Sequence, residues 1–142
     1  MKISARNISK GSVTHLEPGA VNAEVTLAIS GADKIKAIVT SGTVQSLGLA
    51  VGKQVLVLVK DPSVFVQSGN SGVRLCARNC LAGTVTQVLD SAVEAEVTIG
   101  LPGGAREHAV ITHDAVQEPG RRKGVPATAV FKPSSVSLGV AG

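Results

Sequence analysis

Hydrophobic and polar residues alternate along the chain in short runs that have the period of β-strands. Residues 23–30 (AEVTLAIS) and 34–40 (KIKAIVT) flank a turn at 31–33, and this pattern predicts a β-hairpin. Residues 54–60 (QVLVLVK) are apolar enough to predict a strand that is covered on both faces. A further strand is expected at 63–67 (SVFVQ), after a proline.

The pattern is completed by strand-like segments before the hairpin and by one helical stretch after it. The segments KISARN and SVTHLE raise the expected number of strands to about five or six in the first half of the chain. Between Ser41 and Leu49 the apolar residues are spaced for about one helical turn. We therefore expect mostly β-structure with one short helix in this half.

The whole pattern occurs twice. Ala5-Arg6-Asn7 recurs as Ala77-Arg78-Asn79, an offset of 78 − 6 = 72 residues, and the register continues along almost the whole chain without a gap. The period is too long for a solenoid repeat, so it indicates duplication of a complete folding unit. We predict two tandem domains, residues 1–70 and 71–142.

Composition narrows the fold class. The 142 residues are 44% hydrophobic but include no Trp or Tyr and only two Phe, so any core is aliphatic. Many short strands with one short helix favour a small Greek-key barrel of the OB kind. The prediction is an all-β protein of two tandem OB-like Greek-key barrels, each with one short helix. Because domains of this size bury a small fraction of their surface, oligomerisation is expected to help stabilise them.

The charge balance and the cysteines restrict the function classes. Fourteen Lys and Arg against ten Asp and Glu give a formal net charge of +4, a mild basic excess that suits small anions better than nucleic acid. Two cysteines are too few for a secreted disulfide framework, no apolar signal region is visible, and no apolar run is long enough to cross a bilayer. A cytoplasmic protein is the expectation.

Basic residues retained at the repeat offset are the candidates for binding. Arg6 and Arg78 end the first strand of each copy, and Lys60 recurs as Lys132 at the end of the most apolar strand. Such residues can be solvated edge charges or strand-end gatekeepers. Retained together, they favour an anion site, to which the hydroxyls and flexible backbone N–H groups of residues 40–43 (TSGT) could contribute.

Catalytic and metal-binding patterns are missing from the repeat. No histidine is kept between the two copies, and neither copy retains a His, Cys or carboxylate pair suited to acid–base or nucleophilic chemistry. Cys76 and Cys80 alone do not complete a zinc site. We expect no enzymatic activity, no cofactor and no directly bound metal ion.

The retained segments resemble a known family. The SARN opening, the stretch at residues 40–64 and the degenerate second copy are similar to the Mop repeats of molbindins, the molybdate-binding proteins. This resemblance covers nearly the whole chain and implies OB-like barrels that assemble as homotrimers. It further implies that molybdate or tungstate binds at subunit interfaces without chemical change, for storage and homeostasis in the cytoplasm, with no nucleic-acid or membrane partner.

The resemblance also implies the binding residues. They are Ser4, Ala5, Arg6, Thr40, Thr43, Lys60 and Asp61 in the first copy, and Cys76, Ala77, Arg78, Thr112, Lys132 and Ser134 in the second. Cys76 replaces Ser4 and Ala115 replaces Thr43, so the second site is expected to have fewer hydroxyl donors. Asn7 and Asn79 are candidates for an oxyanion site on the symmetry axis.

Two alternative functions remain open from the sequence. A nucleic-acid-binding OB module would stack bases on aromatic side chains, and this chain has almost none. A regulatory or transport-associated ligand sensor is the other alternative, because Mop repeats also occur attached to DNA-binding or ATPase domains.

Overall fold

A computed structural model describes residues 7–30, 33–68, 79–116 and 122–140 of the chain. The first half contains β1 (Asn7–Pro18), β2 (Asn22–Ala28), β3 (Lys34–Thr40), α1 (Ser41–Leu47), β4 (Gln54–Val59), the 3-10 turn η1 (Asp61–Ser63) and β5 (Phe65–Ser68). The second half contains β6 (Asn79–Asp90), β7 (Glu94–Gly100), β8 (Arg106–Thr112), α2 (His113–Val116), β9 (Pro126–Phe131), the 3-10 turn η3 (Pro133–Ser135) and β10 (Val136–Gly139). The prediction of an all-β chain with one short helix in each half is confirmed.

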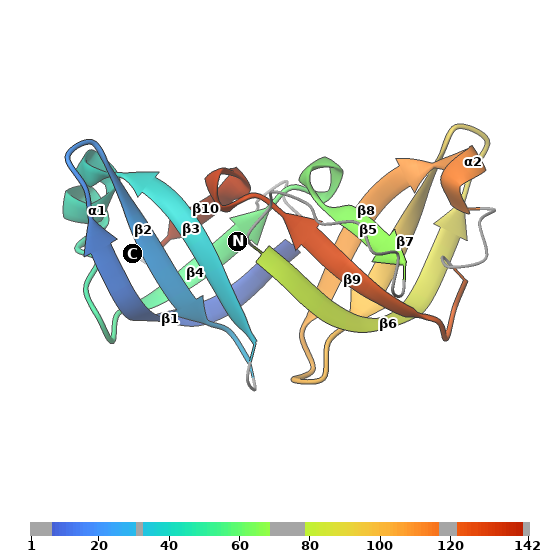
Figure 1. The fold of residues 1–142 in the computed structure, drawn as a ribbon, viewed down its shortest axis with the longest axis horizontal. Helices are drawn as coiled ribbons and strands as arrows, with labels where there is room; N and C mark the ends of the chain where they lie inside the picture. The colour runs from blue at the N-terminus through green and yellow to red at the C-terminus, as the bar shows by residue number, and fades with distance from the viewer. Residues whose placement is uncertain (1–6, 31–32, 69–78, 117–121, 141–142) are drawn as a thin grey trace.

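The strands form two five-stranded sheets that exchange their last strands. The first sheet has the order β10-β4-β1-β2-β3 and the second the order β5-β9-β6-β7-β8. Thus β10 pairs with β4 of the first half, and β5 pairs with β9 of the second half, both antiparallel. Figure 1 shows the two curved sheets side by side, with β5 and β10 crossing between them. The predicted boundary between residues 70 and 71 lies outside the described residues.

Strand alternation produces an aliphatic core in each sheet. In β2 the residues Ala23, Val25 and Leu27 are buried while the residues between them are partly exposed. The matching residues of β7 are buried too, and there Thr98 between them is also buried. Within the described segments, Phe131 is the largest fully buried side chain. Val136 of β10 is 4% exposed and belongs to this core, so the exchanged strands are packed parts of the sheets they join.

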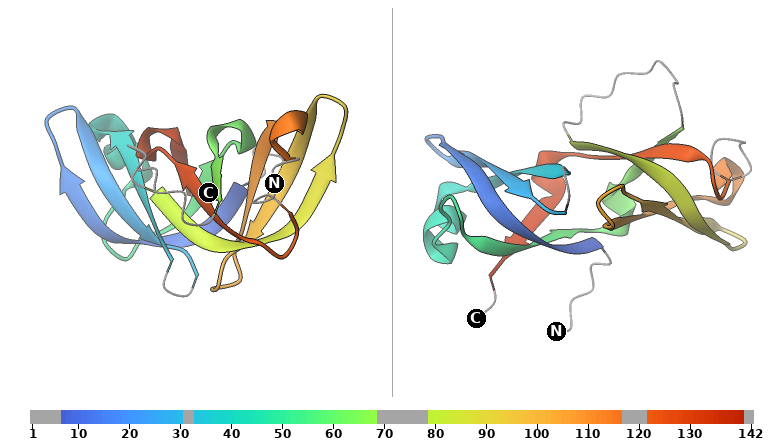
Figure 2. Two further views of the ribbon diagram at one scale, coloured as in Figure 1. Left: turned by 45° about the vertical axis from the view of Figure 1, so that its right-hand side comes forward. Right: turned by 90° about the horizontal axis from the view of Figure 1, so that it is seen from below.

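Both long first strands carry the same bulge. The register of β1 against β2 shifts between Val13 and His15, and that of β6 against β7 shifts between Val85 and Gln87. The residue at each shift is a threonine, Thr14 or its mate Thr86, whose hydroxyl donates to a carbonyl oxygen of the neighbouring strand at 3.3 Å. Bulges bend a strand and increase its twist, which suits the curved sheets seen from two directions in Figure 2.

No helix among the described residues is long and apolar enough to cross a membrane.

Candidate functional site

The predicted arginine sites fall outside the described part of the chain. Ser4, Ala5 and Arg6 precede it, and Cys76, Ala77 and Arg78 lie in the segment between β5 and β6. The other predicted site residues are described, and they occupy the starts of the helices, the 3-10 turns and the first residues of β1 and β6.

Thr40 is held at the start of α1 by a capping interaction. Its Oγ1 accepts a hydrogen bond from the Thr43 N–H at 3.1 Å and lies 2.9 Å from the Thr43 hydroxyl. When Thr43 donates in this hydroxyl pair, the Thr40 proton is left to donate to another acceptor. Capping alone is also a sufficient reason for a threonine here, because it satisfies an otherwise unpaired helix N–H.

The second copy keeps the cap and loses the hydroxyl pair. Thr112 Oγ1 accepts from the Ala115 N–H at 3.1 Å, matching the Thr40 cap, and Ala115 has no hydroxyl to offer. The two helix starts therefore share the cap hydrogen bond and differ in the number of hydroxyls.

The retained lysines lie immediately before the 3-10 turns that lead into the exchanged strands. Lys60 and Lys132 are both exposed and immediately precede η1 and η3. The turn η1 packs against β8, and η3 packs against β3. Consequently Lys132 and Ser134 belong to a segment beside the strand that ends at Thr40, while Lys60 and the buried Asp61 belong to a segment beside the strand that ends at Thr112 (Figure 1).

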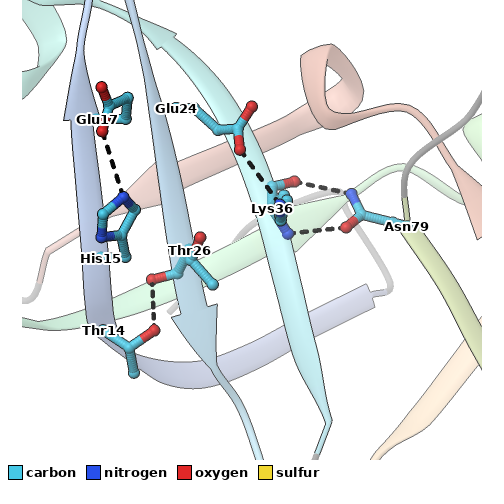
Figure 3. Close-up of polar contacts among 7 residues, drawn as sticks. All are labelled: Thr14, His15, Glu17, Glu24, Thr26, Lys36 and Asn79. Carbon is cyan, nitrogen blue, oxygen red and sulfur yellow. Dashed lines mark hydrogen bonds and ion pairs between the residues drawn. The ribbon is translucent and has the colours of Figure 1, made fainter.

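Asn7 and Asn79 join each sheet to the other. The Asn79 side chain accepts from the Lys36 N–H and donates to the Lys36 carbonyl, both at 2.7 Å, as Figure 3 shows. Asn7 does the same with His108, accepting at 2.6 Å and donating at 2.7 Å. Both asparagines are buried, at 3% and 2% exposure respectively. In both residues predicted for an axial site, the amide oxygen and one amide N–H thus form the hydrogen bonds that join the sheets.

The outer face of each sheet carries a retained glutamate beside a different cation. Glu24 lies 3.4 Å from the Lys36 ammonium (Figure 3). In the second sheet, Glu96 lies 3.4 Å from His108 Nδ1, which is also 3.0 Å from the Thr98 hydroxyl. A permanent ion pair in the first sheet therefore corresponds to a pair in the second that is charged only when the imidazole is protonated.

A buried carboxylate in β8 was not foreseen from the sequence. Glu107 is 2% exposed, and its Oε2 has no hydrogen-bond partner among the described residues. Burial, and to a smaller extent the negative charge of Asp33, raise the pKa of Glu107 from 4.5 to about 7. The repeat offset contains the signal: 107 − 72 = 35, and Ile35 is a core residue at 1% exposure. A glutamate at a position that is a buried isoleucine in the other copy must be neutral or paired to be tolerated.

No group of three or more His, Cys, Asp or Glu side chains in the described segments is arranged to hold a metal ion.

Comparison with known proteins agrees with the duplicated fold. The model of the TOBE domain matches twice, at residues 3–66 and 76–138. The chain belongs to the TOBE-domain family. Its two TOBE copies correspond to the two copies of the 72-residue repeat, although each sheet takes its last strand from the opposite copy.

The relatives of this TOBE protein include molybdenum-binding and molybdenum-transport proteins. The molybdenum transport protein ModE of Azotobacter vinelandii is 42% identical over 142 residues, all of this chain and 52% of ModE. The molybdenum-pterin-binding protein 2 of Clostridium pasteurianum is 42% identical over 66 residues, 46% of this chain and 97% of that protein. The chain spans about half the length of the longer curated relatives that it matches.

A solved structure matches both TOBE copies together. The cytoplasmic molybdate-binding protein ModG, crystallised with molybdate bound, has 50% sequence identity and a TM-score of 0.94, covering 99% of this chain and 100% of that one. This match confirms the predicted pair of OB-like domains and the resemblance to Mop-repeat proteins.

Proposed function

We propose that this protein binds molybdate or tungstate reversibly as the intact oxyanion, without chemical conversion, and serves in cytoplasmic storage and homeostasis of the anion. The observation that carries the proposal is the match to molybdate-bound ModG over nearly the whole length of both chains. No cofactor is needed for this activity, because molybdenum enters and leaves as a tetrahedral dianion.

The proposed sites combine groups from both repeats. Thr40 and Thr43 would act with Lys132 and Ser134, whose segment packs on β3. Thr112 would act with Lys60 and the backbone at Asp61, whose segment packs on β8. Ser4, Ala5 and Arg6, and Cys76, Ala77 and Arg78, are the proposed first-strand contributions. Asn7 and Asn79 would contribute to an axial site only through the N–H that each does not use to join the sheets.

Charge and hydroxyl geometry would together hold the anion. Lys and Arg supply charge-assisted hydrogen bonds, which are roughly twice as strong as neutral ones. A ring of donors disfavours protonated phosphate, because its O–H would face another donor. Sulfate has the same charge as molybdate, so discrimination against it must come from the size of the closed site.

We further propose that the protein acts as a homotrimer with anion sites completed at subunit interfaces. The lysines that would take part are exposed in the single chain, so another subunit can approach them. Small barrels with an aliphatic core also gain stability from association.

Titration with molybdate tests the proposal directly. Isothermal titration of the full chain with molybdate, tungstate and sulfate should show binding of the first two and weak binding of sulfate. Lys132→Ala should cost about 1.5–3 kcal/mol at its site, the range for hydrogen bonds to charged groups. Lys53→Ala is the matched control, because Lys53 is an exposed lysine whose mate in the other copy is Val125. Absence of molybdate binding, or equal affinity for sulfate, would contradict the proposal.

The nucleic-acid alternative has no support from the relatives described above, none of which is named for nucleic-acid binding. The exposed aromatic surface is also small, since Phe131 is fully buried and Phe65 alone is exposed among the described residues. The described surface therefore offers few aromatic side chains on which bases could stack.

A further inference from the structure

An open groove of about 690 Å³ lies where the two sheets meet. Its walls come from the start of β1, from Ile29 and Ser30 directly after β2, and from the β7–β8 turn with the start of β8. The end of β2 and the start of β3 lie near the β7–β8 turn at the bottom of Figure 1, and Figure 2 shows them from a second direction. The hydrogen bonds between Asn7 and His108 hold β1 against β8 at this point.

The polar lining of the groove is basic. Lys10 of β1 and Arg106 of β8 are exposed and charged, and His108, whose Nδ1 lies 3.4 Å from Glu96, also lines the groove. The described residues that line the groove include no carboxylate, but Asp33 is joined to the wall residues Ile29 and Ser30 by backbone hydrogen bonds, and Glu107 is buried in the core next to Arg106. No salt-bridge partner of Lys10 or Arg106 is found among the described residues. Two unneutralised cations on facing elements create a positive potential that favours an anion.

Two serines add hydroxyl groups to this basic surface. Ser9 precedes Lys10, and Ser30 lies at the opposite wall. The Ser30 Oγ is buried without a hydrogen-bond partner in the described structure. A buried hydroxyl without a partner is unfavourable, and an anionic oxygen in the groove would accept its proton.

The rest of the lining is apolar or without side chains. Ile8 and Ile29 contribute aliphatic surface, and Gly103 and Gly104 expose backbone. A simple inorganic anion would leave the aliphatic part in water. An organic anion would cover it, and the volume lies within the range of about 300–1,000 Å³ of small-molecule sites.

The opposite side of the molecule does not repeat this lining. At the repeat offset, Ser9 corresponds to Leu81, Lys10 to Ala82, and Ser30 to Pro102. The hydroxyls and one cation are therefore specific to one of two positions that the duplicated fold makes equivalent. A surface that only kept the protein soluble would not need this difference between copies.

We propose that this groove is a second ligand site, which binds a small organic phosphate. Lys10, Arg106 and Ser30 would bind the phosphate group, because Arg and Lys match phosphate oxygens with charge-assisted hydrogen bonds. Ile8 and Ile29 would cover the apolar body of the ligand. The site shares no residue with those proposed for molybdate, so the two ligands should bind independently.

Phenyl phosphate is a suitable probe, because it combines one phosphate with one apolar ring. Calorimetry of the full chain, saturated with molybdate, should show one phenyl phosphate per chain. Inorganic phosphate should bind about tenfold more weakly, because burial of the ring is lost, and phenol should give no detectable heat. In amide NMR spectra, phenyl phosphate should shift the Ser30, Gly103 and Gly104 signals.

Charge substitutions distinguish a built site from general surface attraction. Lys10→Ala and Arg106→Ala should each weaken phenyl phosphate binding by about tenfold, the effect of one charge-assisted hydrogen bond. Lys34→Ala is the matched control, because Lys34 is the exposed mate of Arg106 in the first sheet. It should leave the affinity unchanged.

Three results would overturn this inference. The first is no binding of phenyl phosphate to the molybdate-saturated protein. The second is an equal loss of affinity in Lys34→Ala, which would indicate nonspecific attraction to basic surface. The third is binding to the molybdate-free protein that molybdate abolishes, which would assign the ligand to the oxyanion sites. Amide spectra verify that each variant remains folded.

Discussion

The side chain of Asn79 pairs with the backbone of Lys36 as though it were one residue of an additional β-strand. It accepts from the N–H and donates to the carbonyl of Lys36, both at 2.7 Å. Asn7 makes the equivalent pair with His108. Because β3 and β8 are edge strands, these amides satisfy backbone groups that would otherwise be unpaired at the junction.

Removal of one amide should destabilise the junction between the sheets. We expect Asn79→Ala to lower the free energy of unfolding by about 1–3 kcal/mol, because it leaves buried backbone groups without partners. Asn22→Ala, at the exposed start of β2, is the control and should have a small effect. Chemical denaturation measures both, and equal stability of Asn79→Ala and the unmodified protein would show that the pair is not stabilising.

The buried carboxylate of Glu107 should make stability depend on pH. Its pKa is about 7 in the folded chain against 4.5 for the ordinary group, so the folded state holds the proton more tightly. The resulting stabilisation is complete below pH 4.5 and is lost as the pH rises through about 7. The total is about 3 kcal/mol by linkage, an order-of-magnitude figure.

Denaturation at several pH values checks this dependence. Glu107→Gln should flatten the stability curve between pH 4.5 and 7, and Glu107→Ile should do the same while restoring the residue type of the other copy. Glu94→Gln, at the exposed start of β7, should keep the unmodified curve. If Glu107→Gln and the unmodified protein change in parallel with pH, Glu107 does not hold its proton in the fold.

A charge on an exchanged strand should disrupt the sheet that receives the strand. Val136 lies in the second half of the sequence but pairs with Val59 in the first sheet. We expect Val136→Asp to cost about 3–5 kcal/mol, the range for an uncompensated buried charge. Hydrogen exchange should increase first in β4 of the first sheet. Ser137→Asp, on the exposed neighbour, is the control, and an increase confined to β9 would contradict the strand pairing.

Substitutions of Thr40 and Thr43 at the start of α1 should distinguish helix capping from ligand binding. Thr43→Ala removes the hydroxyl pair and keeps the backbone cap, so it should weaken proposed molybdate binding with little loss of stability. Thr40→Ala removes the cap as well and should cost about 0.5–2 kcal/mol of stability. Calorimetry and denaturation of both variants give the two readouts. Unchanged molybdate affinity in Thr43→Ala would restrict this residue to a structural contact.

Local patterns explain most of what could be predicted from the sequence. The alternation in residues 23–30 and 34–40 predicted β2 and β3 because the period of side-chain burial is a local property. The sequence predicted hydroxyls at residues 40–43 for an anion site and their partial retention at Thr112, whereas the helix caps that Thr40 and Thr112 form are seen only in the structure. The repeat also predicted two similar folding units.

Properties that depend on long-range pairing were not accessible. Periodicity predicts that 63–67 forms a strand, but it carries no information on which sheet takes that strand, so the exchange of β5 and β10 was left open. Retention at the repeat offset drew attention to Asn7 and Asn79 as possible ligand residues, and their contacts with β8 and β3 became visible only in three dimensions. Glu107 could not be found by retention between the copies, because it differs from its counterpart, the buried Ile35.

The exchange of β5 and β10 determines what a chain with only one repeat could fold into. A gene shortened to one repeat would encode a barrel that lacks a neighbour for β4 or β9, together with a final strand that has no sheet to join. Two copies of that shortened product could each supply what the other lacks. The present chain thus corresponds to an intertwined pair of repeats joined by a peptide link, and a chain that lost either repeat could complete its sheet only by pairing with a second copy.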